Sequence, residues 1–426
     1  MTTRRERRRR RQLEAQESSL GVRAIKYATS WEAIIGLSIL VVLAVFVQGV
    51  FHLSLPFDLG KSPPLPDPWG YVNVPRGSPL KLAYIEDASQ NTSPDTPGAK
   101  QAIELALNEH GKVHNISVEL QVVADTCDEQ AATDQAQALA QDPQVVGVIS
   151  GACEASTLAA KDVFEEVKLP YLSLSNTDPA LTEPGTLVTF RLLWNVKAQG
   201  RQAALYARQT LKTNRALLLH DGSSRAVAVL NEFRDNFRPQ GGQVVDLRAI
   251  DPQGTGWDNV TKESKNLEAD MVYFSGNGKT AGALAAFLHS DGYVGKFMAT
   301  DAAFTDPEYL NTGQAVEGTY VSMQQVPRSA SYAFWKEGYE KEYGPVGPLA
   351  PEAYDATLIL LRTLDSIATL EKDGTLKIGR LQLAGTIRSL PYEGVSGKAS
   401  FDANGDRGSI LAQVMKVENG QFQPVQ

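Results

Sequence analysis

Hydrophobic and polar positions alternate in a regular cycle from Leu80 onward. A short apolar run such as LKLAYI is followed by a turn and then by an amphipathic stretch such as GAKQAIELALNEHG. The apolar members of that stretch share one helical face: Ala99, Ala102, Ile103, Ala106 and Leu107. The same order returns in VVGVISG with CEASTLAAKDVFEEVKLP, and again in DMVYFSG with the stretch behind it. The pattern predicts β-strands that alternate with α-helices.

Strands separated by helices of this length predict parallel sheets with right-handed crossovers and helices on both faces. The cycle starts a second time after LVTFRLLW, so we expect an α/β fold with two lobes. In open α/β sheets, ligands sit beyond the carboxyl ends of the strands. The candidate site is therefore formed by the residues directly after each predicted strand: 86–89, 152–157, 175–178, 221–225, 276–279 and 300–303. They are rich in hydroxyls, amides and Gly, with few groups suited to covalent chemistry.

The segment DMVYFSGNGKTAG contains Gly278-Lys279-Thr280 and invites comparison with a phosphate-binding loop. Such a loop needs an earlier glycine, separated by four residues from Gly-Lys-Thr, so that the backbone N–H groups can curl around the phosphates. That position is Tyr273, inside the predicted strand. We therefore predict a strand-to-helix turn at a cleft, and no nucleotide cofactor.

The first 55 residues differ from the rest of the chain. Residues 1–32 carry nine Lys or Arg against four Asp or Glu, and residues 33–55 read AIIGLSILVVLAVFVQGVFHLSL. A run of this length can cross a ~30 Å hydrocarbon core as a helix, and arginines favour the cytoplasmic side. We predict a basic cytoplasmic tail and a single-pass signal anchor in the cell membrane, with the body outside. For the apolar segment, the alternative is a cleaved signal peptide. For the arginine run, the alternative is binding to nucleic acid or anionic lipid.

A proline-rich segment follows the predicted anchor. Residues 56–80 hold seven prolines and show no helix or strand period. We expect a semi-rigid spacer over residues 56–78.

The remaining chain is acidic and has an ordinary composition for a folded protein. Hydrophobic residues make up 42% of the whole sequence and charged residues 21%. Beyond residue 32 there are 32 basic and 45 acidic residues. This balance, together with the membrane role given to the arginine run, predicts no nucleic-acid partner.

The two cysteines, Cys127 and Cys153, both lie in the outward-facing body. In an oxidising compartment such a pair is most simply one disulfide. A metal site is the weaker alternative, because no His stands nearby to complete one.

Groups suited to catalysis are scarce. Of the five histidines, His220 is the one well placed at a predicted strand end, and no Gly-x-Ser-x-Gly motif accompanies it. The acidic stretch FDANGDRG lacks the glycine that a calcium loop needs at its sixth position, where Arg407 stands, so it predicts a hairpin turn. We expect no catalytic residues, no metal and no cofactor.

The strand-end segments resemble those of the type I periplasmic solute-binding proteins, within them the leucine/isoleucine/valine-binding group. The resemblance covers nearly all of residues 80–426 and rests on the order of these segments: GAKQAIELALNEHG, ADTCDEQAA, GACEASTLAAKDVFEEVKLPYLSLSNTDPALT, PEAYDATLILL and GVSGKASFDANGDRG. It implies two lobes, joined by three crossovers, that close on a small solute. The implied lobes are residues 79–195 with 325–405, and residues 196–324 with 406–426.

The resemblance also implies roles for single residues. It links Cys127 to Cys153. Ser175 and Thr177 match the pair that holds an amino-acid α-carboxylate, and a hydroxyl with exposed N–H groups after a parallel strand suits an anion. Asp301 matches the acid that pairs with the α-ammonium. Turn capping by Ser175 and Thr177, and helix capping by Asp301, are the alternatives.

Three positions depart from the family pattern. Glu154 stands where the amino-acid binders have a serine, Arg225 where an aromatic residue is usual, and Asn277 where another often lines the pocket. An inward Glu repels a carboxylate unless it meets a cation. We hypothesise that Glu154 and Arg225 pair across the closed cleft, that Ser156 and Asn277 face the ligand, and that Lys279 is solvated. The ligand is then more polar than leucine, or is not an α-amino acid.

The leading hypothesis is a membrane-anchored binding protein that captures a small polar solute, an amino acid or a related compound, for an ABC importer. Its partners are then the permease and ATPase subunits. A ligand-sensing ectodomain is the second hypothesis, although about 30 residues inside the cell are too few for a signalling domain. An enzyme is the third, because no catalytic constellation was found.

Overall fold

The computed structural model describes residues 66–88, 98–325, 328–347, 349–408 and 411–425. Contacts between residues group Asp67–Gln426 into one compact unit. The predicted basic tail and signal anchor lie outside the described residues. Within the described ranges, no helix has both the length and the apolar character needed to span a bilayer.

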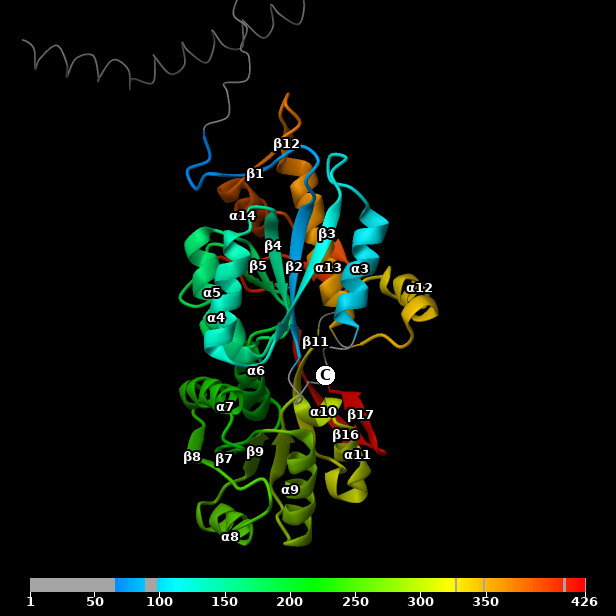
Figure 1. Ribbon diagram of the computed structural model, residues 1–426. Helices are drawn as coiled ribbons and strands as arrows, with labels where there is room; N and C mark the ends of the chain where they lie inside the picture. The colour runs from blue at the N-terminus through cyan, green and yellow to red at the C-terminus, as the bar shows by residue number, and fades with distance from the viewer. Residues whose placement is uncertain (1–65, 89–97, 326–327, 348, 409–410, 426) are drawn as a thin grey trace, which may run out of the picture. The chain divides into compact units, whose positions relative to one another are not determined.

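The first lobe is built on five parallel strands in the order β3-β2-β4-β5-β6. These strands are β2 (Leu80–Asp87), β3 (Val118–Asp125), β4 (Val145–Ser150), β5 (Tyr171–Ser173) and β6 (Thr189–Arg191). Helices cover both faces of this sheet, with α3 and α13 on one side and α4 and α5 on the other (Figure 1). Their bounds are α3 (Ala99–His110), α4 (Glu129–Gln141), α5 (Glu154–Val167) and α13 (Ala350–Ile367).

Strand β2 shows why its sequence is apolar along nearly its whole length. Leu82 and Tyr84 belong to the core beneath α3 and α13, whereas Ala83 and Ile85 belong to the core beneath α4 and α5. Successive side chains of a strand point to opposite faces, so a strand covered on both sides has no polar face to expose.

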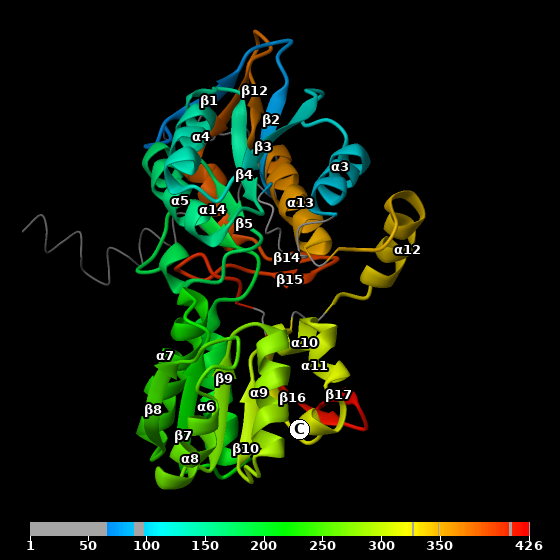
Figure 2. The same ribbon diagram turned by 60° about the horizontal axis from the view of Figure 1, so that its bottom comes forward.

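The second lobe is built on seven strands in the order β17-β16-β11-β10-β9-β7-β8. The five parallel strands are β7 (Arg215–His220), β8 (Gln243–Ala249), β9 (Met271–Ser275), β10 (Lys296–Ala299) and β11 (Tyr320–Gln325). Two antiparallel strands extend the edge, β16 (Leu411–Glu418) and β17 (Gln421–Pro424). The helices of this lobe are α6 (Val196–Gln209), α7 (Ser224–Phe237), α8 (Asp258–Asn266) and α9 (Gly278–Ser290), followed by short α10 (Ala302–Thr305) and α11 (Pro307–Asn311). Figure 2 shows α9 and α10 beside the strands of this lobe.

The chain crosses from one lobe to the other three times. The crossings follow β6, β11 and β15 (Gly397–Ala399), and they lead to α6, α12 (Tyr332–Tyr343) and β16 respectively. The first lobe also holds α14 (Arg380–Ser389) and the hairpin of β14 (Tyr392–Gly394) with β15. The predicted fold class of two α/β lobes, each with a mainly parallel sheet, is confirmed.

The predicted spacer is wrong at its carboxyl end. Residues Tyr71–Val74 form β1, which pairs antiparallel with β13 (Leu376–Gly379), itself paired with β12 (Thr369–Leu370). Val72 and Val74 are buried in the first-lobe core. Four residues between Gly70 and Pro75 are too few to reveal a strand period, so the sequence pattern did not predict this strand.

Candidate functional site

A cavity of about 930 Å³ lies at the carboxyl ends of the parallel strands and is lined from both lobes. The first lobe contributes Glu154, Ser175 and Thr177, and the second contributes Arg225 and Asp301. The apolar part of the wall comes from Leu193, Trp194, Phe304, Met323, Leu349 and Met415. An apolar wall with a few converging polar groups is the usual character of a small-molecule site.

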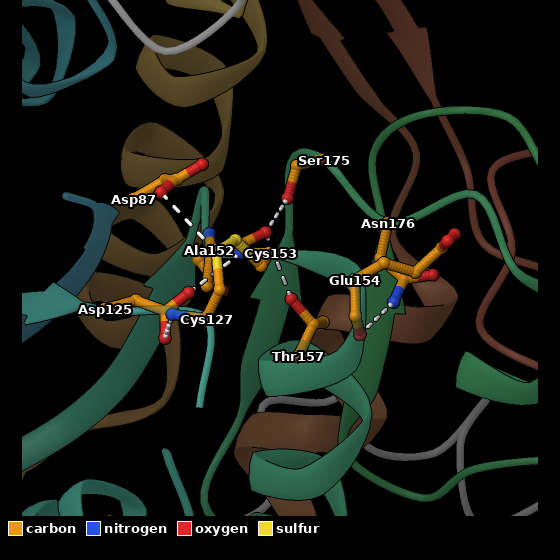
Figure 3. The surroundings of a disulfide bond; sticks show 10 residues. Asp87, Asp125, Cys127, Ala152, Cys153, Glu154, Thr157, Ser175 and Asn176 are labelled. Atoms are coloured by element: carbon orange, nitrogen blue, oxygen red, sulfur yellow. Dashed lines mark hydrogen bonds between the residues drawn. A yellow bond between two sulfur atoms is a disulfide. The ribbon is translucent and has the colours of Figure 1, made fainter. Parts of the chain in front are cut away.

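Glu154 is positioned by the turn between β4 and α5, because it is the first residue of α5. The preceding residue, Cys153, is disulfide-bonded to Cys127 with 5.4 Å between the Cα atoms. Asp125, which is 1% exposed, accepts the backbone N–H groups of Cys127 at 3.1 Å and of Cys153 at 2.9 Å (Figure 3). The end of β3 and the start of α5 are thus tied together beside the cavity.

Ser175 and Asn176 join the turn after β5 to the turn between β4 and α5. The Ser175 hydroxyl donates to the carbonyl of Ala152 at 2.7 Å, and the Asn176 amide donates to the carbonyl of Glu154 at 3.0 Å (Figure 3). The hydroxyl hydrogen of Ser175 is therefore used inside the protein. This leaves Thr177 as the better placed hydroxyl for a ligand.

Arg225, near the start of α7, reaches across to the first lobe. Its Nη2 pairs with Asp301 Oδ2 at 2.7 Å, and its Nε donates to Thr177 Oγ1 at 3.1 Å. In this structure Arg225 pairs with Asp301, and the ion pair with Glu154 that we hypothesised for the closed cleft is not formed. Two carboxylate oxygens within reach of one guanidinium hold it better than a longer-range charge does.

Asp301 follows β10 and is largely buried, with a side chain 13% exposed. It precedes α10 but makes no capping hydrogen bond there. Its carboxylate accepts instead from Gln199 Nε2 at 2.9 Å and from Arg225. The resemblance assigns the Asp301 carboxylate to a ligand's ammonium, but here Arg225 already pairs with it.

Burial raises the pKa of the Glu154 carboxyl, and nearby Asp178 raises it further. Arg225 and backbone hydrogen bonding from Thr177 and Asp178 oppose that rise. The Glu154 carboxyl therefore lies beside the turn where the resemblance would place a ligand's carboxylate, while the Asp178 N–H in that turn donates to Asn176 Oδ1 at 2.8 Å.

Three other predicted residues lie outside the cavity lining. Asn277 caps α9, with its Oδ1 accepting from the Thr280 N–H at 2.8 Å. Ser156 is buried on the inner side of α5. Lys279 is 76% exposed and lies 3.8 Å from Glu308, which confirms the prediction that it is solvated.

The cavity lining also holds residues that the sequence reasoning missed, among them Gln324, Arg328, Glu352 and Trp194, whose indole adds an N–H to the wall. Gln324 stands at the end of β11, where the strand-end rule would have found it had that strand been recognised. Glu352 stands in the first turn of α13, within the segment PEAYDATLILL that carried the resemblance.

Comparison with known proteins decides the family. The model of the periplasmic binding protein family matches residues 79–421. The chain belongs to the periplasmic binding protein family. Members of this family bind solutes for transporters, so the chain is a solute-binding protein and not an enzyme.

Individual relatives of this periplasmic binding protein are distant. An amino acid binding protein of Pseudomonas aeruginosa is 25% identical over 311 residues, covering 72% of this chain and 81% of that protein. A Leu/Ile/Val-binding protein of Citrobacter freundii is 25% identical over 342 residues, covering 78% and 89%. Among solved structures, a leucine binding protein of Thermotoga maritima aligns with a TM-score of 0.65 and 23% identity, covering 82% of this chain and 98% of that one, which shows the fold alone.

Proposed function

We propose that this periplasmic binding protein captures a small polar solute, of the size of an amino acid, and delivers it to the permease of an ABC importer. The observation that carries the proposal is the cavity at the strand ends, lined from both lobes and crossed by Arg225. Relatives named for leucine, isoleucine and valine binding support a solute of this size.

The ligand's head group differs, in this proposal, from that of leucine. Arg225 occupies Asp301, and the Glu154 carboxyl lies close to the backbone of Thr177, so a charged group of the protein already stands at each end of a zwitterion site. A free α-amino acid must displace two internal partners to bind there, which opposes its binding. We therefore propose that neutral polar solutes bind more tightly than zwitterionic ones.

A binding screen tests this function on the full-length chain in detergent. Thermal unfolding is followed with amino acids, amides, short-chain acids, polyamines, sugars and nucleotides. A solute that binds only the folded state, at a thousandfold excess over its dissociation constant, adds about 4 kcal/mol of stability. We expect a rise of several degrees in the unfolding midpoint with at least one small solute. A folded protein that no solute stabilises would contradict the proposed function.

We also propose that residues 33–55 anchor the protein in the membrane. The support is the 23-residue apolar segment behind a basic tail, which is long enough to span the hydrocarbon core. The expected result is that the chain stays in the membrane pellet after an alkaline carbonate wash, whereas a chain truncated before Asp67 is released. Release of the untruncated chain by the wash would refute the anchor.

A further inference from the structure

Three buried polar side-chain atoms on the cavity wall have no hydrogen-bond partner among the described residues. They are Glu352 Oε2, Gln324 Oε1 and Trp194 Nε1. Two are acceptors and one is a donor. A buried polar atom without a partner costs about 1–3 kcal/mol, so three such atoms on residues that line one cavity favour a ligand that completes their hydrogen bonds.

Glu352 is fixed in place by an ion pair. Its side chain is 3% exposed, and its Oε1 accepts from Arg328 Nη1 at 2.7 Å. The second oxygen, Oε2, is left without a donor. Because Oε1 is already held, Oε2 is the oxygen of this carboxylate that is left to accept a further hydrogen bond.

The orientation of the Gln324 amide is fixed by a neighbour as well. Its Nε2 donates to the carbonyl of Asn195 at 2.8 Å, and the residue is 3% exposed. Turning the amide over would place its oxygen against that carbonyl, so Oε1 is the atom left without a partner. Trp194, next along the chain to Asn195, contributes the single donor.

Charge around Glu352 is already balanced. Arg328 pairs with it directly, and Arg407 and Asp355 act on it through space. Arg407 donates to the carbonyls of Lys398 and Leu192 and to the Ser396 hydroxyl. It therefore stabilises the negative charge of Glu352 without giving Oε2 a hydrogen bond. Glu352 has one guanidinium in direct contact and a second at longer range. The missing partner is thus a neutral N–H group rather than a further cation.

We infer that Glu352, Gln324 and Trp194 form a subsite for a primary carboxamide or an equivalent neutral group. The two hydrogens of the amide NH₂ would reach Glu352 Oε2 and Gln324 Oε1, and its carbonyl would accept from Trp194 Nε1. This inference rests on the proposed function, because the subsite lies in the same cavity.

Titration calorimetry on the full-length chain tests the subsite with probes that share a skeleton: pentanamide, pentanoate and pentylammonium, and benzamide, benzoate and benzylammonium. In at least one set we expect the amide to bind about tenfold tighter than the acid and the amine, since either replacement leaves a buried group unpaired. Glu352→Gln should remove this preference, and Trp194→Phe should weaken the amide severalfold. Glu371→Gln and Trp257→Phe are matched controls remote from the cavity lining, and both should leave the affinities unchanged.

The outcomes separate the subsite from the function. Equal affinities within every set, or an amide preference that survives both Glu352→Gln and Trp194→Phe, overturn the subsite. If the six probes fail while leucine or another solute binds, the subsite is overturned and the proposed function stands. If no solute binds at all, both are overturned. Trp194→Phe removes the indole N–H together with part of the ring but no charge, so it keeps the test valid even if Glu352→Gln does not fold.

Discussion

Replacing Glu154 with Ser and Arg225 with Ala together is expected to tighten the binding of L-leucine by about a hundredfold, on the estimate that each released charged group gains roughly 1.5–3 kcal/mol of hydrogen bonding to the ligand. The change to Glu154 removes a negative charge beside the backbone of Thr177, where the ligand's carboxylate would lie. The change to Arg225 frees Asp301, which still keeps its hydrogen bond from Gln199, for the ammonium. Titration calorimetry on the full-length variant and the parent chain measures the ratio of the two affinities.

The two single variants show whether both internal partners block the site. Each frees one end of the zwitterion site, so the pair should act more strongly together than the sum of the singles. Thermal unfolding of each apo variant checks that the lobes are intact. Unchanged leucine affinity in a folded double variant would show that Glu154 and Arg225 do not select against the zwitterion.

The two lobes could be predicted from the sequence because the strand and helix patterns repeat along the chain. A strand buried on both faces and a helix with one apolar face recur from Leu80 onward, so the period of each element could be recognised several times over. The strand β1 escaped for the opposite reason. Its two buried residues, Val72 and Val74, stand in a four-residue strand between Gly70 and Pro75, and their partner β13 lies about three hundred residues away in the chain.

The sequence predicted where the site lies but not which of its side chains pair with one another. The strand-end rule led to Glu154, Thr177, Arg225 and Asp301, and all four line one cavity. The partner of Arg225 could not be deduced, because Glu154 and Asp301 are both acids placed after strands. The choice between them depends on side-chain reach across the two lobes, which a linear pattern does not encode. Glu352 was missed because it lies at the start of a helix, where an acidic residue is ordinarily attributed to the helix dipole.

Behind the ligand-facing side chains, a buried ion pair holds the turn that carries Thr177. The Arg191 side chain is fully buried, and its Nε donates to Asp406 Oδ1 at 2.8 Å. The same guanidinium donates to the carbonyl of Asn176 at 2.9 Å, one residue before Thr177. Asp406 Oδ2 accepts from Asn195 Nδ2 at 2.8 Å, in the first connection between the sheets. The pair thus joins the turn of Asn176 and Thr177 to two of the three connections between the lobes.

Replacing Asp406 with Ala is expected to lower the free energy of unfolding by about 3–5 kcal/mol, because it leaves the buried charge of Arg191 without its counter-ion. Denaturant unfolding of the full-length chain measures the loss. Glu340→Ala breaks the exposed pair with Lys336 on α12 and should cost at most about 0.5 kcal/mol. An Asp406→Ala variant no less stable than Glu340→Ala would contradict the assigned role.

The double variant Arg191→Met with Asp406→Ala distinguishes an unpaired charge from a lost turn. If the cost comes from the uncompensated guanidinium, removing that charge should restore a substantial part of the stability. Solute affinity should not recover, because Arg191 also held the carbonyl of Asn176 and with it the position of Thr177. Recovered stability with weakened binding would therefore assign the pair to positioning the ligand-binding turn, whereas recovery of both would leave it a purely structural role.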